Sequence, residues 1–254
     1  MNEKEKEKEE EEEKEKEKDG KATSTLILLA MNEHVELDNP AWYALTEYHR
    51  NFAIDYGDLK CYHPDYCPFG GFENGVEISS ALDQYAMLAN NFFIIGEKPV
   101  HSKLLRLKQE LICVQMICTN IIDHHIGEDI TALQEEHAEP LLKLVNLVQP
   151  GYFKDKTRLL GDYHGIFRNG SLVAVTGERM KTNNYVEVSA VVTHPEYTGR
   201  GYAKQLVTHT TNAILKQNKI PFLHVAKTNT VAIRLYEGLG FQERREISFW
   251  NLAR

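Results

Sequence analysis

The sequence has few cysteines and no long apolar run, and we expect no secretory leader. Four cysteines in 254 residues are too few for the disulfide framework of a small secreted scaffold. No apolar run approaches the roughly 18 residues of a membrane span. The first residues are acidic, whereas a secretory signal is basic and then apolar. We therefore expect a cytoplasmic protein without a membrane partner.

An excess of positive charge is missing too, and the net charge of −8 is unevenly placed. Residues 1–19 hold ten Glu, one Asp and six Lys, so they carry −5 and the remainder only −3. We expect residues 1–23 to form a disordered acidic Glu/Lys tail, because so polar a repeat cannot bury a core. The nearly neutral remainder offers no basic patch, so no nucleic-acid partner is expected.

The rest of the chain divides into residues 24–127 and 128–254. A hydrophobic content of 42% is enough for a packed core, and the length allows one large domain or two small ones. The first part is expected to contain a buried strand at Thr25–Met31 and three helical segments, at Trp42–Phe52, Ser79–Asn90 and Ser102–His125. No motif assigns it a function, and a degenerate copy of the second part's fold stays open.

Residues 128–254 show a clearer alternation of strands and helices. Asn169-Gly170 lies between two apolar alternating runs, which is a strong signal for a type I′ hairpin. The expected elements around this hairpin are a strand at Ile130–Leu133, a helix at Glu135–Val148, a strand at Tyr185–Thr193, a helix at Lys204–Gln217, a strand at Ile220–Ala226, a helix from Asn229 and a strand at Arg244–Arg254. This order predicts an α/β fold around a mixed sheet.

A glycine-containing turn, THPEYTGRGYA, joins the strand at Tyr185–Thr193 to the next helix. The first amides of a helix have no partner within the helix, and the helix dipole favours anions there. Gly199 and Gly201 therefore suggest a cradle for a pyrophosphate, although an ordinary tight turn is the alternative. The turn is no Walker loop, and Lys204 stands where a dinucleotide fingerprint has its third small residue.

Two motifs in this order carry a family resemblance. After the turn and the next strand comes NTVAIRLYEGLGF, in which Asn229 can cap a helix and Tyr236 shares its face. Tyr185–Phe241 resembles the core of the GNAT superfamily, the acyl-CoA-dependent N-acyltransferases. Ile130–Arg254 is most similar to the branch related to glycine N-acyltransferases. The resemblance implies a GNAT-like mixed central sheet flanked by helices, with an additional α-rich or α/β N-terminal region.

The resemblance also implies acetyl-CoA as cosubstrate. Backbone amides of the turn would hold the pyrophosphate, and amides at the end of the preceding strand would polarise the thioester carbonyl. Thr198 departs from the Arg or Gln that usually opens the family's loop. The expected cofactor-binding residues are Val191, Val192, Thr193, Thr198, Gly199, Arg200, Gly201, Tyr202, Ala203, Lys204 and Asn229.

Two residues are expected to be catalytic. Glu187 is the candidate general base: strand alternation would place it on one face with Ser189 and Val191, and burial would raise its pKa. A solvent-facing strand glutamate is the alternative, and Glu178 and His224 are reserve candidates. Tyr236 stands where the family has the tyrosine that protonates the departing thiolate, although it could instead be a core aromatic.

The sequence thus favours an N-acetyltransferase that transfers an acetyl group from acetyl-CoA to a primary amine by direct attack in a ternary complex. A catalytically silent acyl-CoA-binding regulatory module is the alternative. The acceptor is expected to be a small-molecule amine or an amino acid, a protein amine is also allowed, and a homodimer stays open. No metal is expected: Cys61, His63 and Cys67 lie close in sequence, but no fourth ligand is evident.

Overall fold

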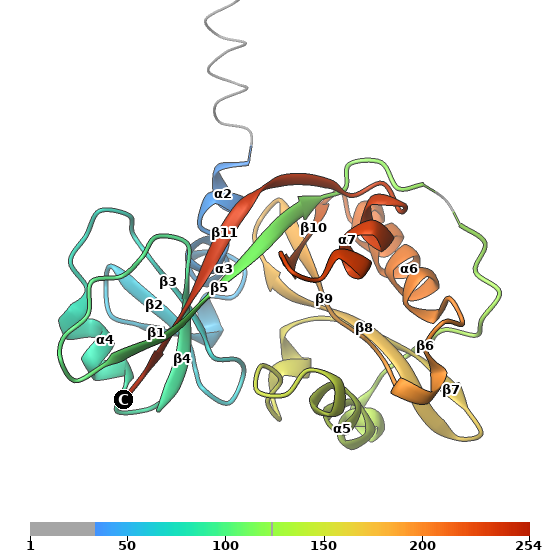
Figure 1. Cartoon of the computed structure of the whole chain (residues 1–254), viewed down its shortest axis with the longest axis horizontal. Helices are drawn as coiled ribbons and strands as arrows, with labels where there is room; N and C mark the ends of the chain where they lie inside the picture. The colour runs from blue at the N-terminus through green and yellow to red at the C-terminus, as the bar shows by residue number, and fades with distance from the viewer. Residues whose placement is uncertain (1–33, 123) are drawn as a thin grey trace, which may run out of the picture. The chain divides into compact units, whose positions relative to one another are not determined.

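The computed structural model describes residues 34–122 and 124–254 (Figure 1). The acidic tail and the expected strand at Thr25–Met31 lie outside the described residues. Helix α2 (Val35–Asp38) is short, and residues 39–254 form one compact unit. No helix in the described part of the chain is both long and apolar enough to cross a membrane.

A mixed sheet runs through residues 39–254 in the order β1-β2-β3-β4-β11-β5-β10-β9-β8-β7-β6. The β9–β10 and β3–β4 pairs are parallel and the others are antiparallel. The strands are β1 (Ala53–Asp55), β2 (Leu59–Tyr62), β3 (Phe69–Phe72), β4 (Asn91–Ile95), β5 (Arg106–Ile117), β6 (Thr131–Ala132), β7 (Tyr163–Arg168), β8 (Ser171–Lys181), β9 (Tyr185–Thr193), β10 (Ile220–Ala226) and β11 (Gln242–Ala253).

Helices cover this sheet, as the α/β prediction requires. The α-helices are α3 (Pro40–Thr46), α4 (Ser79–Tyr85), α5 (Ala138–Val148), α6 (Tyr202–Lys216) and α7 (Thr230–Glu237). Single 3-10 turns are η1 (Arg50–Phe52), η2 (Glu135–His137), η3 (Thr157–Leu160) and η4 (Pro195–Tyr197). Figure 1 shows α5 and α6 on opposite sides of β8 and β9.

The two covered faces have separate cores. Val186 and Val188 of β9 pack with Val207 of α6 and Leu223 of β10. Val192, also of β9, belongs instead to the cluster around α5. The two sides of a strand normally alternate residue by residue, so this change of face within β9 marks an irregularity that proves central to the site.

The elements expected in residues 128–254 are present. Asn169 and Gly170 both have positive φ, 51° and 77°, as a type I′ turn requires. The Asn229 side chain accepts a hydrogen bond from the Ala232 amide at 3.1 Å and caps α7. The helix expected from Glu135 starts as the η2 turn, and α5 proper begins at Ala138.

The helix expected at Ser102–His125 is wrong. Residues 106–117 form strand β5, which is buried on both faces in its second half. A strand covered on both sides has a continuous apolar run instead of an alternating one, and such a run does not distinguish strand from helix. The two other helical segments are shorter than expected: Trp42–Phe52 contains most of α3 and the η1 turn, and Ser79–Asn90 is α-helical as far as Tyr85.

Strand β5 lies between β10 and β11 and is antiparallel to both. Figure 1 shows β5 and β11 running side by side. The sheet therefore crosses the sequence boundary between residues 127 and 128, because a strand from the first segment separates two strands of the second. The division stays a prediction about the organisation of the sequence.

Candidate active site

A cavity opens where β9 and β10 stop pairing. Their parallel register runs from Tyr185 opposite Ile220 to Glu187 opposite Phe222 and ends there. Beyond this point Val188–Val191 of β9 and His224 and Ala226 of β10 line one cavity of about 320 Å³. A parallel pair that separates leaves main-chain groups on both inner edges without a strand partner, and a ligand can bind there.

A β-bulge in β9 faces this cavity. Val192 lies opposite Val175 and Ser189 opposite Gly177, so β9 has one residue more than β8 in this interval. Ala190 takes the left-handed conformation with φ 50°. The extra residue of a bulge leaves the ladder and re-aims the groups beside it. The amides at Ala190 and Val191 are therefore candidates for polarising a bound carbonyl.

The bulge overturns the expected alternation of Glu187, Ser189 and Val191. Val191 packs on the side of α6 and α7, together with Val188, whereas Val192 packs on the side of α5. Insertion of one residue moves every later side chain to the other face. Val191 therefore does not share a face with Glu187.

The predicted anion cradle follows β9. The η4 turn leads into Gly199 and Gly201, with φ of 74° and 76°, and Gly201 is the N-terminal cap of the 15-residue helix α6. A Cβ added at either glycine would meet nothing within 4 Å, so this surface is open. The Tyr202, Ala203 and Lys204 amides form the first turn of the helix and have no partner within it.

The side chains of the predicted cofactor-binding residues have other contacts. The Thr198 hydroxyl donates to the Pro195 carbonyl at 3.1 Å, and the Arg200 guanidinium lies 4.8 Å from the centre of the Tyr197 ring. Tyr202 and Val192 are buried in cores on different sides of the sheet. The glycine loop, the start of α6 and the end of β9 thus follow one another in the structure. Because their side chains have other contacts, the backbone is the feature that these three segments share.

Glu187 lies beside the cavity but does not line it. It is fully buried. The Arg179 guanidinium donates two hydrogen bonds to the Glu187 carboxylate, from Nε to Oε2 at 2.8 Å and from Nη2 to Oε1 at 2.6 Å. His224 Nδ1 lies 2.8 Å from the same Oε1.

Burial by itself raises the pKa of Glu187, but the Arg179 charge and the hydrogen bonds from Arg179 and His224 outweigh it and lower the pKa to about 2. The raised pKa expected for a general base is therefore wrong. So acidic a carboxylate accepts a proton poorly at neutral pH.

Tyr236 of α7 lines the cavity and is 8% exposed. Burial raises its pKa to about 12, so the phenol keeps its proton at neutral pH, as a general acid must. The reserve candidate Glu178 belongs to another environment: its carboxylate pairs with Lys181 at 2.5 Å and does not line the cavity.

The other end of the cavity consists of residues that the sequence did not single out. The Phe69 ring stacks on Tyr152 with an interplanar angle of 20° and meets Phe249 edge-on. The Arg179 guanidinium lies over Phe69, 4.6 Å from the ring centre. Among the described residues no Asp or Glu lines this cavity. No sequence motif marks these rings, because they come from β3, β11 and the loop after α5.

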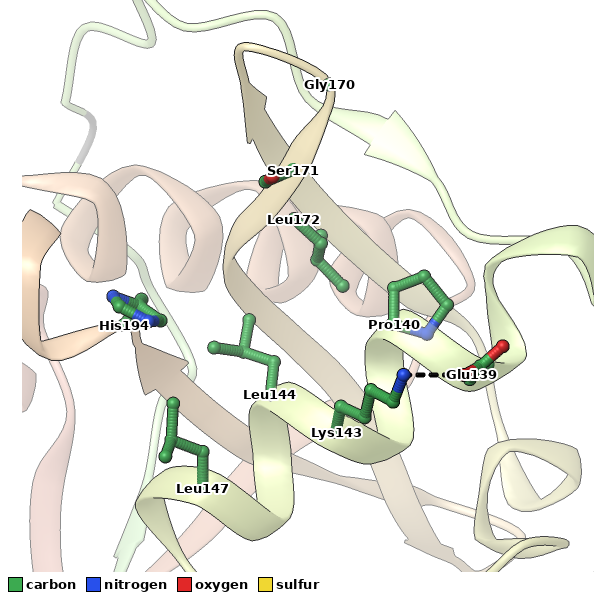
Figure 2. Close-up of a pocket in the computed structure, with 9 residues that line it drawn as sticks. All are labelled: Glu139, Pro140, Lys143, Leu144, Leu147, Gly170, Ser171, Leu172 and His194. Carbon is green, nitrogen blue, oxygen red and sulfur yellow. Dashed lines mark ion pairs between the residues drawn. The ribbon is translucent and has the colours of Figure 1, made fainter.

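A second cavity of about 390 Å³ lies between α5, the β7–β8 turn and His194. Figure 2 shows Leu144, Leu147 and Leu172 around it, and its two charged groups, Lys143 and Glu139, pair with each other at 2.5 Å. Neither the bulge nor the start of α6 borders it. We therefore place the candidate active site in the cavity between β9 and β10.

The CYHPDYC segment forms no metal centre in the described residues, where no three His, Cys, Asp or Glu side chains are grouped to hold a metal ion. Cys61 and Cys67 are buried free thiols. Burial raises the pKa of Cys67 to about 12, so in the absence of a bound cation this thiol keeps its proton at neutral pH.

Comparisons with known proteins identify the family of the chain. The family described as FR47-like protein matches residues 163–250. A solved structure from Novosphingobium aromaticivorans, assigned to the GNAT family of acetyltransferases, is 30% identical, with a TM-score of 0.79 over 86% of this chain and 98% of its own. The chain belongs to the GNAT family.

More distant solved structures share the fold. A GCN5-related N-acetyltransferase-like protein from Streptococcus suis is 16% identical, with a TM-score of 0.55 over 82% of this chain and 92% of its own. A GCN5-related N-acetyltransferase from Kribbella flavida is 14% identical, with a TM-score of 0.55 over 83% and 92%. No curated protein matches the chain significantly.

Proposed function

We propose that this protein is an acyl-CoA-dependent N-acyltransferase that transfers an acetyl group from acetyl-CoA to a primary amine. The observation that carries the proposal is the course of the chain through β9: the strand supplies the edge of the cavity and the bulge at Ala190, and the segment that follows it forms the glycine turn that starts α6. A CoA molecule needs its pyrophosphate and its thioester bound at two separated places, and β9 offers both.

In the proposed reaction the acceptor nitrogen attacks the thioester carbonyl carbon directly. The developing oxyanion is stabilised by amides at the Ala190–Val191 bulge. The carbon–sulfur bond then breaks, the sulfur leaves with the electron pair, and the Tyr236 hydroxyl donates the proton that converts it to the CoA thiol. The attacking nitrogen then releases its extra proton to solvent, and the Tyr236 phenolate takes a proton back. The products are a neutral amide, free CoA and the unchanged enzyme.

The reaction also requires that the acceptor nitrogen loses its proton before it attacks. Because Glu187 is saturated with donors, we propose that it fixes Arg179 and His224 and that the acceptor reacts as the free amine, having lost its proton to solvent. Glu187 as the base stays a prediction, and the dependence of rate on pH distinguishes the two (Discussion).

The cavity favours a small acceptor with one amine and an apolar body. Its outer end is aromatic, and no described Asp or Glu lines it to attract a second cation. Polyamines and lysine-rich peptides are therefore disfavoured. The proposed membership of the glycine N-acyltransferase branch adds amino acids as candidates.

The test is calorimetric titration of acetyl-CoA into the full chain and into Gly201→Glu. We expect micromolar binding to the parent and at least a tenfold loss in the variant, because a carboxylate at the start of α6 repels the pyrophosphate. Gly57→Glu is the matched control, since Gly57 also has positive φ and open space around it. Equal loss in both variants, or no binding by the folded parent, would contradict the proposal.

The second candidate is a catalytically silent acyl-CoA-binding module, and the unusually acidic Glu187 is the observation that favours it. A screen of free amines with acetyl-CoA distinguishes the two functions. Binding of acetyl-CoA without release of CoA thiol for any amine supports the module, and turnover of one amine supports the enzyme.

A further inference from the structure

A chain of polar side chains crosses five neighbouring strands beside the cavity, with one residue from each. In sheet order they are Arg179 of β8, Glu187 of β9, His224 of β10, Gln115 of β5 and Arg244 of β11. Glu187 and Gln115 are fully buried and the His224 side chain is 2% exposed. In such a row of buried polar side chains each donor must face an acceptor, so the position of every proton matters.

The orientation of the Gln115 amide follows from Arg244. The guanidinium can only donate hydrogen bonds, and its Nη1 lies 2.9 Å from Gln115 Oε1. The amide oxygen must therefore face Arg244, and the amide nitrogen faces His224, with Gln115 Nε2 and His224 Nε2 3.0 Å apart.

The protonation of His224 follows in turn. A donating amide requires a lone pair at His224 Nε2, so the proton of the neutral ring is on Nδ1, where it donates to Glu187 Oε1 at 2.8 Å. An imidazolium would place two donors face to face at Nε2. If Gln115 turned to relieve this clash, its NH₂ group would meet the Arg244 guanidinium instead.

We propose that Gln115 and Arg244 are positioning residues of the active site, which hold His224 as a neutral imidazole protonated on Nδ1 and so keep the wall of the acceptor cavity free of an added positive charge. His224 lines that cavity, and Gln115 and Arg244 act only through it. Among the described residues, the ionisable groups around the ring are Glu187, Arg179 and Arg244 in the row of polar side chains, and Cys113, Tyr152 and Tyr236 along the cavity.

The benefit for acyl transfer rests on the proposed function. An amine reaches the enzyme mainly as an ammonium ion at neutral pH. With His224 neutral, Arg179 is the only full positive charge among the described residues that line the cavity, and Glu187 balances it. A charged His224 would leave an excess of one positive charge beside the ammonium and would weaken acceptor binding.

The deciding experiment is ¹⁵N NMR of the histidine side chains of the full chain at pH 7, with His224 assigned by comparison with His224→Gln. We expect a protonated Nδ1 and an unprotonated Nε2. In Gln115→Glu a carboxylate accepts from both Arg244 and Nε2, so both ring nitrogens should be protonated. A parent ring protonated on Nε2, or a variant ring that keeps the parent pattern, overturns the proposal.

A second pair of variants decides the matter if Gln115→Glu does not fold. Arg244→Lys keeps a donor for the Gln115 carbonyl and should keep Nδ1 protonated and Nε2 unprotonated. Arg244→Met removes that donor, so Gln115 can turn and a proton should appear on Nε2. Identical histidine spectra for the two variants overturn the proposal.

The kinetic consequence is measured with 2-phenylethylamine, a monoamine with an aromatic body. Gln115→Glu adds one negative charge together with the positive charge on His224, but His224 lines the cavity and position 115 does not. The acceptor therefore meets the positive charge at shorter range, and we expect its KM to rise about tenfold at pH 7. A protonated ring with an unchanged KM overturns the role in acceptor binding. Absence of turnover in the parent contradicts the proposed function alone, because the NMR result does not depend on activity.

Discussion

Glu187 shows how far a residue's chemistry depends on its partners. Its position on the strand before the glycine turn is the one expected from the sequence, but Arg179 and His224 saturate both carboxylate oxygens. Arg179 is eight positions away and His224 is 37 positions away along the chain, and no pattern in the sequence indicates that they meet Glu187.

Glu187→Gln is expected to destabilise the protein by about 3 kcal/mol at pH 7, because it leaves the nearly buried Arg179 charge without its partner. Urea denaturation measures this loss. The exposed Glu243 on β11 gives the matched control, Glu243→Gln, which should stay within about 0.5 kcal/mol of the parent. Equal stability of the parent and Glu187→Gln would contradict the assignment.

The stability difference between the parent and Glu187→Gln should depend on pH. The folded pKa of Glu187, about 2, lies below the ordinary value of 4.5, so its stabilisation is complete above pH 4.5 and is lost as the pH falls towards 2. The stability difference between parent and Glu187→Gln should therefore narrow over this interval. A difference that stays constant in urea titrations from pH 5 to pH 3 would show that Glu187 is not the responsible group.

The rate of acyl transfer should also depend on pH in a diagnostic way. If the acceptor loses its proton to solvent, kcat/KM rises about tenfold per pH unit towards the amine's own pKa. A base on the enzyme would instead add a plateau at its own, lower pKa. Initial rates of CoA release between pH 6 and pH 10, with two amines of different pKa, separate these cases.

Tyr236→Phe should lower kcat about 100-fold and leave acetyl-CoA binding unchanged, because the phenyl ring fills the same space but cannot protonate the thiolate. Tyr185→Phe is a suitable control, since Tyr185 is buried on β9 and does not line the cavity. Single-turnover kinetics would detect the change. A kcat within threefold of the parent would remove Tyr236 from the mechanism.

At the scale of the element, the decisive feature is the bulge in β9. Ala190 holds a left-handed conformation that alanine tolerates and a β-branched residue does not. The sequence YVEVSAVVT reads as a regular strand, because the small residues Ser189 and Ala190 are the only local trace of the irregularity.

Ala190→Val is expected to lower stability by about 2 kcal/mol and to reduce kcat more than acetyl-CoA binding, because a β-branched residue opposes the left-handed backbone conformation on which the bulge depends. Ala190→Gly is the matched control and should remain active, since glycine accepts positive φ. Thermal unfolding and steady-state kinetics of both variants test this. Full activity in Ala190→Val would show that the bulge is not needed.

At the scale of the whole molecule, the position of β5 ties the two sequence segments together. β10 and β11 do not pair with each other, because β5 lies between them over most of its length. Residues 128–254 by themselves would leave both strands with unsatisfied main-chain groups and exposed apolar side chains.

A fragment of residues 128–254 is therefore expected not to fold cooperatively, whereas the full chain does. Circular dichroism and urea denaturation of the two proteins test this. Adding a fragment of residues 39–127 that contains β5 should restore the folded signal if the strand is what the first fragment lacks. A cooperative transition in residues 128–254 alone would show that the sequence boundary is also a folding boundary.

Local signals in the sequence were sufficient for the elements of residues 128–254, for the glycine turn and for the family resemblance. The Asn169-Gly170 hairpin, the Asn229 cap and the positive φ of Gly199 and Gly201 depend on a few neighbouring residues, and the structure contains all of them. Such features are readable because turn and cap energetics are local.

Tertiary structure decided the place of β5, the bulge in β9 and the ionisation of Glu187. Each depends on residues distant in the chain: a strand covered on both faces has no diagnostic period, and a bulge is fixed by the register with β8. The acidity of Glu187 reflects charges and donors from β8 and β10, which burial makes strong. The sequence by itself therefore determined the family and its local turns and caps, and only the assembled sheet determined which side chains lie together at the candidate site.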